Sequence, residues 1–495
     1  MKFNDLINKG PIYVAGAVFI AVALGVFLLA VLAATITFRR AEVASIYNNV
    51  KVPIEGIEPR SGLWGQNYPR EWETWKKTRE MDFKSKYLGS VMDDVLAHRP
   101  EMVVLWAGYA FSRDYSAPRG HWYTIEDMRQ TLRVGAPGVD GQGDLQPGTC
   151  WACKSPDVPR LMQEKGLENF YQAKWSDWGP EVVNAIGCAD CHDPATMNLT
   201  ITRPALVEAY QRQGKNIKDA TLQEMRSLVC AQCHVEYYFK GDGKYLTFPW
   251  DDGMSMEDME AYYDNLDYGD WTHALSKTKM LKAQHPDYEL FKLGTHGQRG
   301  LSCADCHMPY ISEGGLKFSD HHLMSPLKNV ASTCQTCHRD TEANLISYVY
   351  ERQDKILEIR DRLEPELAKA HIMAKLAWEK GAAEAEMAPA QKLIRAAQWR
   401  WDFGVASHGA SFHAPIETQR ILAHGLDKAL QAQMLLKDVL YGQGLTEFEM
   451  PDLSSKEKAQ AYIGLDMDKL RGQKAEFVKT VVPQWLDAAR KNGRI

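Results

Sequence analysis

The sequence has no cysteine outside a C-x-x-C pair, no glycine-rich phosphate-binding loop, and little alternation of Val, Ile or Thr with polar residues. Without a P-loop or dinucleotide fingerprint there is no motif for nucleotide binding, and the weak alternation predicts a low strand content. Positive charge is not in excess either, because 58 lysines and arginines face 64 acidic residues, giving a net charge of −6. We therefore expect no nucleic acid partner.

Charge is also missing from a long segment near the N-terminus. No charged side chain occurs from Gly10 to Phe38, and as a helix this run is long enough to cross a hydrocarbon core of about 30 Å. The apolar part of a cleavable signal peptide is usually shorter, at about 7–15 residues. Residues 1–40 are therefore predicted to be either a signal peptide cleaved near Ala33 and Ala34 or an uncleaved membrane anchor, and the length favours the anchor.

The ten cysteines are the most informative feature of the chain. They form five pairs: Cys150/Cys153, Cys188/Cys191, Cys230/Cys233, Cys303/Cys306 and Cys334/Cys337. Four pairs are followed directly by a histidine, namely His192, His234, His307 and His338, whereas the first is followed by Lys154. A structural zinc site, disulfides or a thioredoxin-like pair explain this pattern poorly, because the histidine recurs four times in one register.

The C-x-x-C-H motif is typical of covalent c-type haem attachment. Two thiols three residues apart reach the two vinyl groups of one haem, and the next residue presents its imidazole to the iron. Four low-spin haems also need four second axial ligands, which the eleven other histidines or the 19 methionines can supply. Because bacteria attach c-type haem outside the cytoplasmic membrane, residues 41–495 are predicted to be periplasmic.

The first motif, Cys150-Trp-Ala-Cys-Lys154, has lysine in the histidine position. One interpretation is a degenerate site that has lost its histidine. The other is a haem with a deprotonated lysine on one face and an open position on the other, where a substrate binds. Since six-coordinate bis-histidine haems only pass electrons, the five motifs predict four relay haems and one reaction centre.

The composition changes after His338. Val349, Ile356 and Leu363 are spaced by seven residues, which predicts a long amphipathic helix that Pro365 can kink. Further helices are predicted over about 390–407, from Pro415 to about Tyr441, and over about 467–491.

These patterns together predict a mainly α protein with a multihaem cytochrome c fold. Its parts are an irregular pentahaem catalytic region over 41–340 and a long-helix region over 341–495. The striped helices suit either an intramolecular core or a subunit interface. Residues 41–110 allow no placement of individual elements.

The motifs resemble those of the ammonia-forming cytochrome c nitrite reductase family over about residues 60–495. The resemblance rests on the four C-x-x-C-H motifs, Cys-Trp-Ala-Cys-Lys at 150–154, Cys-His-Val-Glu-Tyr-Tyr-Phe at 233–239, Leu-Lys-Ala-Gln-His-Pro at 281–286 and Gln-Trp-Arg-Trp-Asp at 398–402. It implies a periplasmic enzyme that reduces nitrite to ammonium with six electrons. It also implies a homodimer formed through the long C-terminal helices, with a quinol-oxidising membrane cytochrome or a soluble multihaem cytochrome as electron donor.

The resemblance further implies roles for individual residues. Lys154 would be the proximal ligand of the active-site haem, with Arg133, Tyr237 and His285 lining its open face. The distal ligands of the other four haems would be His121, His296, His321 and His413, with His322 and His408 as alternatives to the last two. A calcium ion would bind the side chains of Glu236 and Gln284 and the backbone carbonyls of Tyr237 and Lys282.

Two other functions remain open on the sequence alone. A pure electron carrier would have five six-coordinate haems, and the Lys154 motif argues against it. A related multihaem reductase or oxidase would act on hydroxylamine, sulfite or tetrathionate, although such relatives usually carry more haem motifs.

Overall fold

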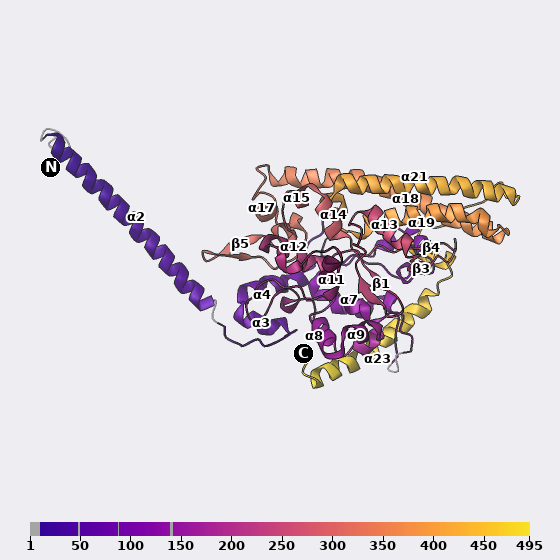
Figure 1. The fold of residues 1–495 in the computed structure, drawn as a ribbon, viewed down its shortest axis with the longest axis horizontal. Helices are drawn as coiled ribbons and strands as arrows, with labels where there is room; N and C mark the ends of the chain where they lie inside the picture. The colour runs from indigo at the N-terminus through magenta and orange to yellow at the C-terminus, as the bar shows by residue number, and fades with distance from the viewer. Residues whose placement is uncertain (1–9, 48–49, 88, 139–141) are drawn as a thin grey trace.

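The computed structural model describes residues 10–47, 50–87, 89–138 and 142–495 (Figure 1). Over these ranges it is mainly helical, and its strands form three separate two-stranded antiparallel sheets. The pairs are β1 (Tyr238–Lys240) with β2 (Tyr245–Thr247), β3 (Trp271–Thr272) with β4 (Lys279–Met280), and β5 (Tyr310–Glu313) with β6 (Leu316–Ser319). The low strand content confirms the prediction from the weak alternation.

Helix α2, Pro11–Tyr47, stands apart from the folded body (Figure 1). Its segment Pro11–Glu42 has a mean hydropathy of 2.9 over its most apolar stretch, and none of that stretch is buried. Among the described residues this is the one helix long and apolar enough to cross a membrane. Its threonine hydroxyls are satisfied inside the helix, because Thr35 and Thr37 each donate to a carbonyl four residues earlier.

Short helices and the three strand pairs make up the regular structure from residue 61 to residue 333. Several begin at a capping box, as where Thr221 and Glu224 bond each other's backbone N–H groups. Their bounds are α3 Ser61–Asn67, α4 Pro69–Lys76, α5 Val95–His98, α6 Glu101–Leu105, α7 Thr124–Gln130, α8 Asp157–Lys165, α9 Leu167–Gln172, α10 Cys188–Cys191, α11 Pro204–Arg212, α12 Leu222–Ala231, α13 Met256–Asn265, α14 Asp287–Leu293, α15 Thr295–Gln298, α16 Cys303–His307 and α17 Val330–Thr333.

The predicted C-terminal helices are all present. They are α18 Glu342–Glu379, α19 Glu384–Ala406, α21 Pro415–Gly442 and α23 Met467–Lys491, with the short α20 Ala410–His413 and α22 Lys456–Tyr462 between them. Helix α21 lies along both α18 and α19 (Figure 1). The predicted start of α19 at residue 390 was wrong, because the Glu386 carboxylate accepts a hydrogen bond from the Ala383 N–H at 2.7 Å and begins the helix earlier. Pro389 therefore lies inside it.

Two buried clusters form the hydrophobic core, and each draws on both predicted regions. In the first cluster Trp399 of α19 packs against Tyr263 of α13, with ring centres 5.5 Å apart. In the second, Trp401 of α19 packs against Trp106, which follows α6, at 5.4 Å. The regions 41–340 and 341–495 consequently share their cores.

Candidate functional site

All ten cysteines line one connected cavity of about 2210 Å³. A pocket for a single small ligand is usually about 300–1,000 Å³. Cys337 is exposed at its rim, and the other nine thiols are partly buried. The volume and the spread of the thiols along the walls fit several large prosthetic groups better than one ligand.

Eight of the histidines lining this cavity face one another in four pairs. The ring centres are 6.2 Å apart in His121–His234 and His192–His321, and 6.3 Å apart in His296–His338 and His307–His413. Two imidazoles that bind one metal ion from opposite sides, each through a nitrogen at about 2 Å, have ring centres roughly 6 Å apart. Each pair thus leaves room for one iron atom, and each contains one histidine that follows a C-x-x-C pair.

Hydrogen bonds donated by Nδ1 orient several of these rings. The partners are backbone carbonyl oxygens: Met197 at 2.9 Å from His192, Met324 at 3.0 Å from His307, and Ser319 at 2.9 Å from His321. A neutral imidazole that donates from Nδ1 keeps a lone pair on Nε2, the atom that binds a metal. Nδ1 of His234 instead lies 3.5 Å from the carboxylate of Asp287.

The alternative histidines named from the sequence differ in whether their rings face a histidine that follows a C-x-x-C pair. His321, not the adjacent His322, has its ring opposite His192. His413, not His408, has its ring opposite His307. Gly409 makes this second arrangement possible, because a Cβ at that position would lie 2.4 Å from the His413 ring.

Lys154 follows the 3-10 turn Gly148–Trp151, which carries the first cysteine of the first pair. Its backbone N–H donates to the Trp151 carbonyl, and its own carbonyl accepts from the Thr124 hydroxyl, both at 2.9 Å. His285 is near enough for its pKa to be affected by the Lys154 ammonium. Burial first, and this ammonium second, lower the pKa of His285 well below its ordinary value.

Arg133 and Tyr237 reach the same cavity from two other segments. Arg133 lies in the 3-10 turn after α7, where its Nε donates to the Thr131 hydroxyl at 3.1 Å and its guanidinium carbon lies 4.5 Å from the centre of the Phe111 ring. Tyr237 directly precedes β1. Burial raises the pKa of Tyr237 well above its ordinary value, with the adjacent Cys153 and Cys150 adding to the effect. The four predicted catalytic residues therefore surround the first cysteine pair.

The residues predicted to bind calcium also lie together. Glu236 is fully buried, and its carboxylate accepts from the Gln284 N–H at 2.6 Å and from the Tyr263 hydroxyl at 2.9 Å. The Gln284 side-chain amide lies 3.3 Å from the Lys282 carbonyl. A flip of the Gln284 side-chain amide exchanges its nitrogen and oxygen. After this flip the Gln284 side-chain oxygen and the Lys282 carbonyl oxygen lie side by side, as two ligands of one ion would.

The charge balance around Glu236 favours a bound cation. Burial raises the pKa of Glu236 well above its ordinary value, and the carboxylates of Asp270 and Glu289 add to the rise. The Lys282 ammonium does not compensate Glu236, since it pairs with the buried carboxylate of Asp402 at 2.7 Å. Hard oxygen ligands with excess negative charge suit Ca²⁺, so the residues present fit this ion.

Sequence reasoning missed the aspartates that hold this region in place. Asp402 also accepts from the Ala283 N–H at 3.2 Å, which fixes the segment carrying the Lys282 carbonyl. The motif Cys-Ala-Asp-Cys-His occurs twice, at 188–192 and 303–307, and its repeated aspartate could have indicated a structural role. Asp190 forms an ion pair with Arg203 and Asp305 one with Arg226, both at 2.6 Å.

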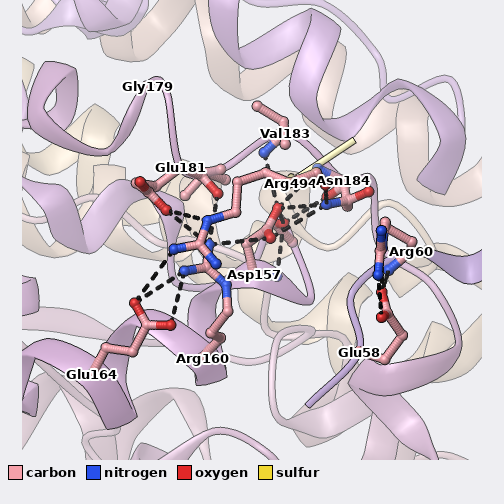
Figure 2. Close-up of polar contacts among 12 residues, drawn as sticks. Glu58, Arg60, Asp157, Arg160, Glu164, Gly179, Glu181, Val183, Asn184 and Arg494 are labelled. Atoms are coloured by element: carbon pink, nitrogen blue, oxygen red, sulfur yellow. Dashed lines mark hydrogen bonds and ion pairs between the residues drawn. The ribbon is translucent and has the colours of Figure 1, made fainter. Parts of the chain in front are cut away.

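A polar network fixes the chain just after Lys154 (Figure 2). The fully buried carboxylate of Asp157 accepts from the backbone N–H groups of Val183 and Asn184, both at 2.9 Å. Arg494, next to the C-terminus, donates to Glu181 at 2.8 Å. The last residues of the chain are thereby attached beside α8 (Figure 2).

Comparisons with known proteins agree with this geometry. Residues 61–493 match the family described as cytochrome c552. The chain is similar to cytochrome c-552 of Bacteroides fragilis, with 64% identity over 95% of both chains. It is also similar to cytochrome c-552 of Maridesulfovibrio salexigens, with 44% identity over 99% of this chain and 96% of the relative.

Among solved structures it is similar to the cytochrome c nitrite reductase of Desulfovibrio desulfuricans, whose catalytic subunit is described with two calcium sites. The TM-score is 0.75 at 32% identity, covering 85% of this chain and 91% of that one.

Proposed function

The chain belongs to the cytochrome c552 family, and from this premise we propose that it is a periplasmic cytochrome c nitrite reductase that reduces nitrite to ammonium. It is an oxidoreductase with haem c as cofactor, and its solved relative at 32% identity is a cytochrome c nitrite reductase. The observation that carries the proposal is the set of four facing histidine pairs beside one motif that ends in lysine.

Each histidine pair is assigned to one haem iron. His192 and His321 serve the haem on Cys188/Cys191, and His234 and His121 the haem on Cys230/Cys233. His307 and His413 serve the haem on Cys303/Cys306, and His338 and His296 the haem on Cys334/Cys337. Lys154 would be the ligand that the chain supplies to a haem held by Cys150 and Cys153, and Arg133, Tyr237 and His285 would line the space for substrate.

A haem held at the first motif would supply the electron-transfer chemistry for nitrite reduction. Reduction of nitrite to ammonium takes six electrons and eight protons and releases two water molecules. The Arg133 guanidinium attracts the anion and donates hydrogen bonds to its oxygens. A ring N–H of His285 donates a hydrogen bond to a nitrite oxygen, which leaves as water once it has been protonated. The Tyr237 hydroxyl, whose raised pKa keeps it protonated, is a further donor.

The five C-x-x-C motifs, called attachment loops here and numbered in chain order from Cys150/Cys153 to Cys334/Cys337, also suggest the route of electrons. The third loop is linked to the first through Arg203, which bonds both Gln232 and the Ala152 carbonyl, and to the fourth through Ser227 of α12, whose hydroxyl accepts from the Cys303 N–H at 3.1 Å. The third loop therefore lies between the first and the fourth. We infer that electrons reach the Lys154 motif through the third loop, delivered by a membrane quinol dehydrogenase or a soluble multihaem cytochrome.

We propose that the enzyme is a homodimer joined through its long C-terminal helices. Helix α21 supports this, because it leaves the apolar side chains of Ile416, Leu430 and Met434 exposed in the single chain. Two copies packed through these helices would bury that surface.

Turnover of nitrite with reduced viologen, with ammonium quantified, tests the function. We expect one ammonium for every six electrons. The purified protein should contain five haems per chain, and EPR should show one of them to be high-spin. Four haems, or five low-spin haems without nitrite turnover, would instead indicate an electron carrier.

Helix α2 is predicted to remain on the mature protein and anchor it in the membrane. N-terminal sequencing of protein isolated from the native membrane fraction should then begin before residue 30. The apolar run in α2 is longer than the apolar region of a usual signal peptide, which is about 7–15 residues. A first residue beyond 30, with the enzyme in the soluble fraction, would identify the segment as a signal peptide.

Glu236→Ala should remove one calcium ion per chain and lower nitrite turnover by about 10–100-fold, the usual effect of loosening a metal's supporting shell. The five haems should stay attached, since Glu236 belongs to no C-x-x-C-H motif. Metal analysis and kinetics at confirmed haem loading provide the measurement. Glu351→Ala, an exposed glutamate paired only with Lys355, is the control. Unchanged calcium content in Glu236→Ala would exclude Glu236 from the site.

A further inference from the structure

Arg203 is an arginine that is only 1% exposed and whose guanidinium binds two of the attachment loops. Nε donates to the carbonyl of Ala152, inside the first loop, at 2.7 Å. One terminal nitrogen donates to the carbonyl of Ser155 at 2.7 Å and to the carboxylate of Asp190, inside the second loop, at 2.6 Å. Lys154 therefore lies between two backbone carbonyls that one guanidinium holds.

The third loop reaches the same centre through Gln232, which lies between Cys230 and Cys233. Its side-chain oxygen accepts from the backbone N–H groups of Thr202 at 3.0 Å and Arg203 at 3.2 Å. Its side-chain nitrogen donates to the Asp190 carbonyl at 2.8 Å. Since Gln232 is also 1% exposed, solvent does not compete for these bonds.

These contacts use the particular geometry of arginine. With a further bond to the Thr202 hydroxyl at 2.6 Å, four of the five N–H groups of Arg203 have acceptors on the residues named above. A planar guanidinium directs its donors at fixed angles, whereas lysine carries one point charge with rotating donors. Lysine can keep the ion pair with Asp190, but it cannot hold Ala152 and Ser155 at the same time.

We propose that Arg203 is a positioning residue for the reaction centre: it fixes the segment that presents Lys154 and locks the first three attachment loops into one rigid unit. The proposal rests on the proposed role of Lys154 as the axial ligand. Because Gln232 of the third loop bonds the Arg203 N–H and the Asp190 carbonyl, a shift of the first loop relative to these residues changes both the direction of the Lys154 amine and the separation of the first and third motifs. The position of the Lys154 ligand and the supply of electrons to the first motif thus both depend on the Arg203 side chain.

Arg203→Lys is the test variant, because it keeps a cation beside Asp190. We expect five haems per chain and a kcat for nitrite at least tenfold below wild type. The KM should change less than twofold, since Arg203 does not touch the substrate. The high-spin EPR signal should broaden or split, because Lys154 no longer has a single orientation. Arg203→Met should also shift the reduction potentials of the first and second haems to more negative values, since the buried positive charge that bonds those two loops is lost.

Arg400→Lys is the matched control. Arg400 is similarly buried and bonds the Glu260 carboxylate twice at 2.8 Å, but these bonds involve no attachment loop. Both lysine variants should lose thermal stability, and only Arg203→Lys should change the high-spin signal and kcat. A wild-type kcat and EPR spectrum in Arg203→Lys, or equal changes in Arg400→Lys, would overturn the proposal.

If Arg203→Met does not fold, Arg203→Lys alone decides the question. Nitrite turnover and the EPR spectrum of the wild-type protein distinguish failure of this inference from failure of the proposed function. Absence of nitrite turnover and of a high-spin haem in the wild type removes the proposed function. Normal wild-type turnover with an unaffected Arg203→Lys variant removes only the role of Arg203.

Discussion

Lys154→His should lower kcat for nitrite by roughly 100-fold while five haems remain attached. The thioether bonds need Cys150 and Cys153 rather than the lysine, so attachment does not depend on residue 154. An amine donates to iron only through its σ lone pair, whereas an imidazole also interacts through its π system. The substitution therefore changes how the iron donates electrons to nitrite on the opposite face.

The KM of this variant should change much less than its kcat. Arg133 and His285, the proposed substrate-binding groups, lie at the cavity wall and are not altered. Loss of an interaction that acts mainly in the transition state lowers kcat with little effect on KM. Steady-state kinetics at confirmed full haem loading is the measurement, with Lys165→His on the exposed end of α8 as control. A wild-type kcat in Lys154→His would indicate that nitrite is reduced at another haem.

His413→Ala should convert one low-spin haem to high-spin and reduce nitrite turnover by at least about tenfold. The His413 ring lies 6.3 Å from that of His307, so its removal leaves the iron on Cys303/Cys306 without its second axial ligand. A change of coordination at a relay haem alters its potential and slows electron supply. EPR should then show two high-spin haems per chain in place of one.

His408→Ala is the matched comparison for His413→Ala. His408 lines the same cavity and lies five positions earlier in the chain, but its ring is not the one opposite His307. All four low-spin signals should survive its removal. If His408→Ala creates the second high-spin haem and His413→Ala does not, the assignment of the distal ligand is reversed.

Much of the helical architecture was predictable because it depends on local patterns. Helix α23 has the predicted bounds of 467–491, and α21 begins at Pro415, a favoured first-turn residue. Helix α19 was misplaced because the Glu386 capping bond decided its start, while the apolar stripe and Pro389 suggested a later one. The elements between residues 61 and 110 carried no clear period, since their short helices take their shape from tertiary packing.

The attachment motifs needed no fold to be recognised. Two thiols and a following histidine or lysine within five consecutive residues form a local motif, so the ten cysteines, the four histidines that follow them and Lys154 could be recognised directly in the sequence. The family resemblance extended this reading to the distal ligands and the calcium residues, but it did not say which histidine faces which.

The pairing of the histidines was decided by tertiary structure alone. His121 lies more than a hundred residues before His234, and His413 a similar distance after His307, so no sequence period relates the members of a pair. The same holds for Arg203, whose bonds join three loops that are distant in sequence. The attachment motifs are made of neighbouring residues, whereas the facing of two histidine rings and the hydrogen bonds between loops exist only once the chain has folded around the cavity.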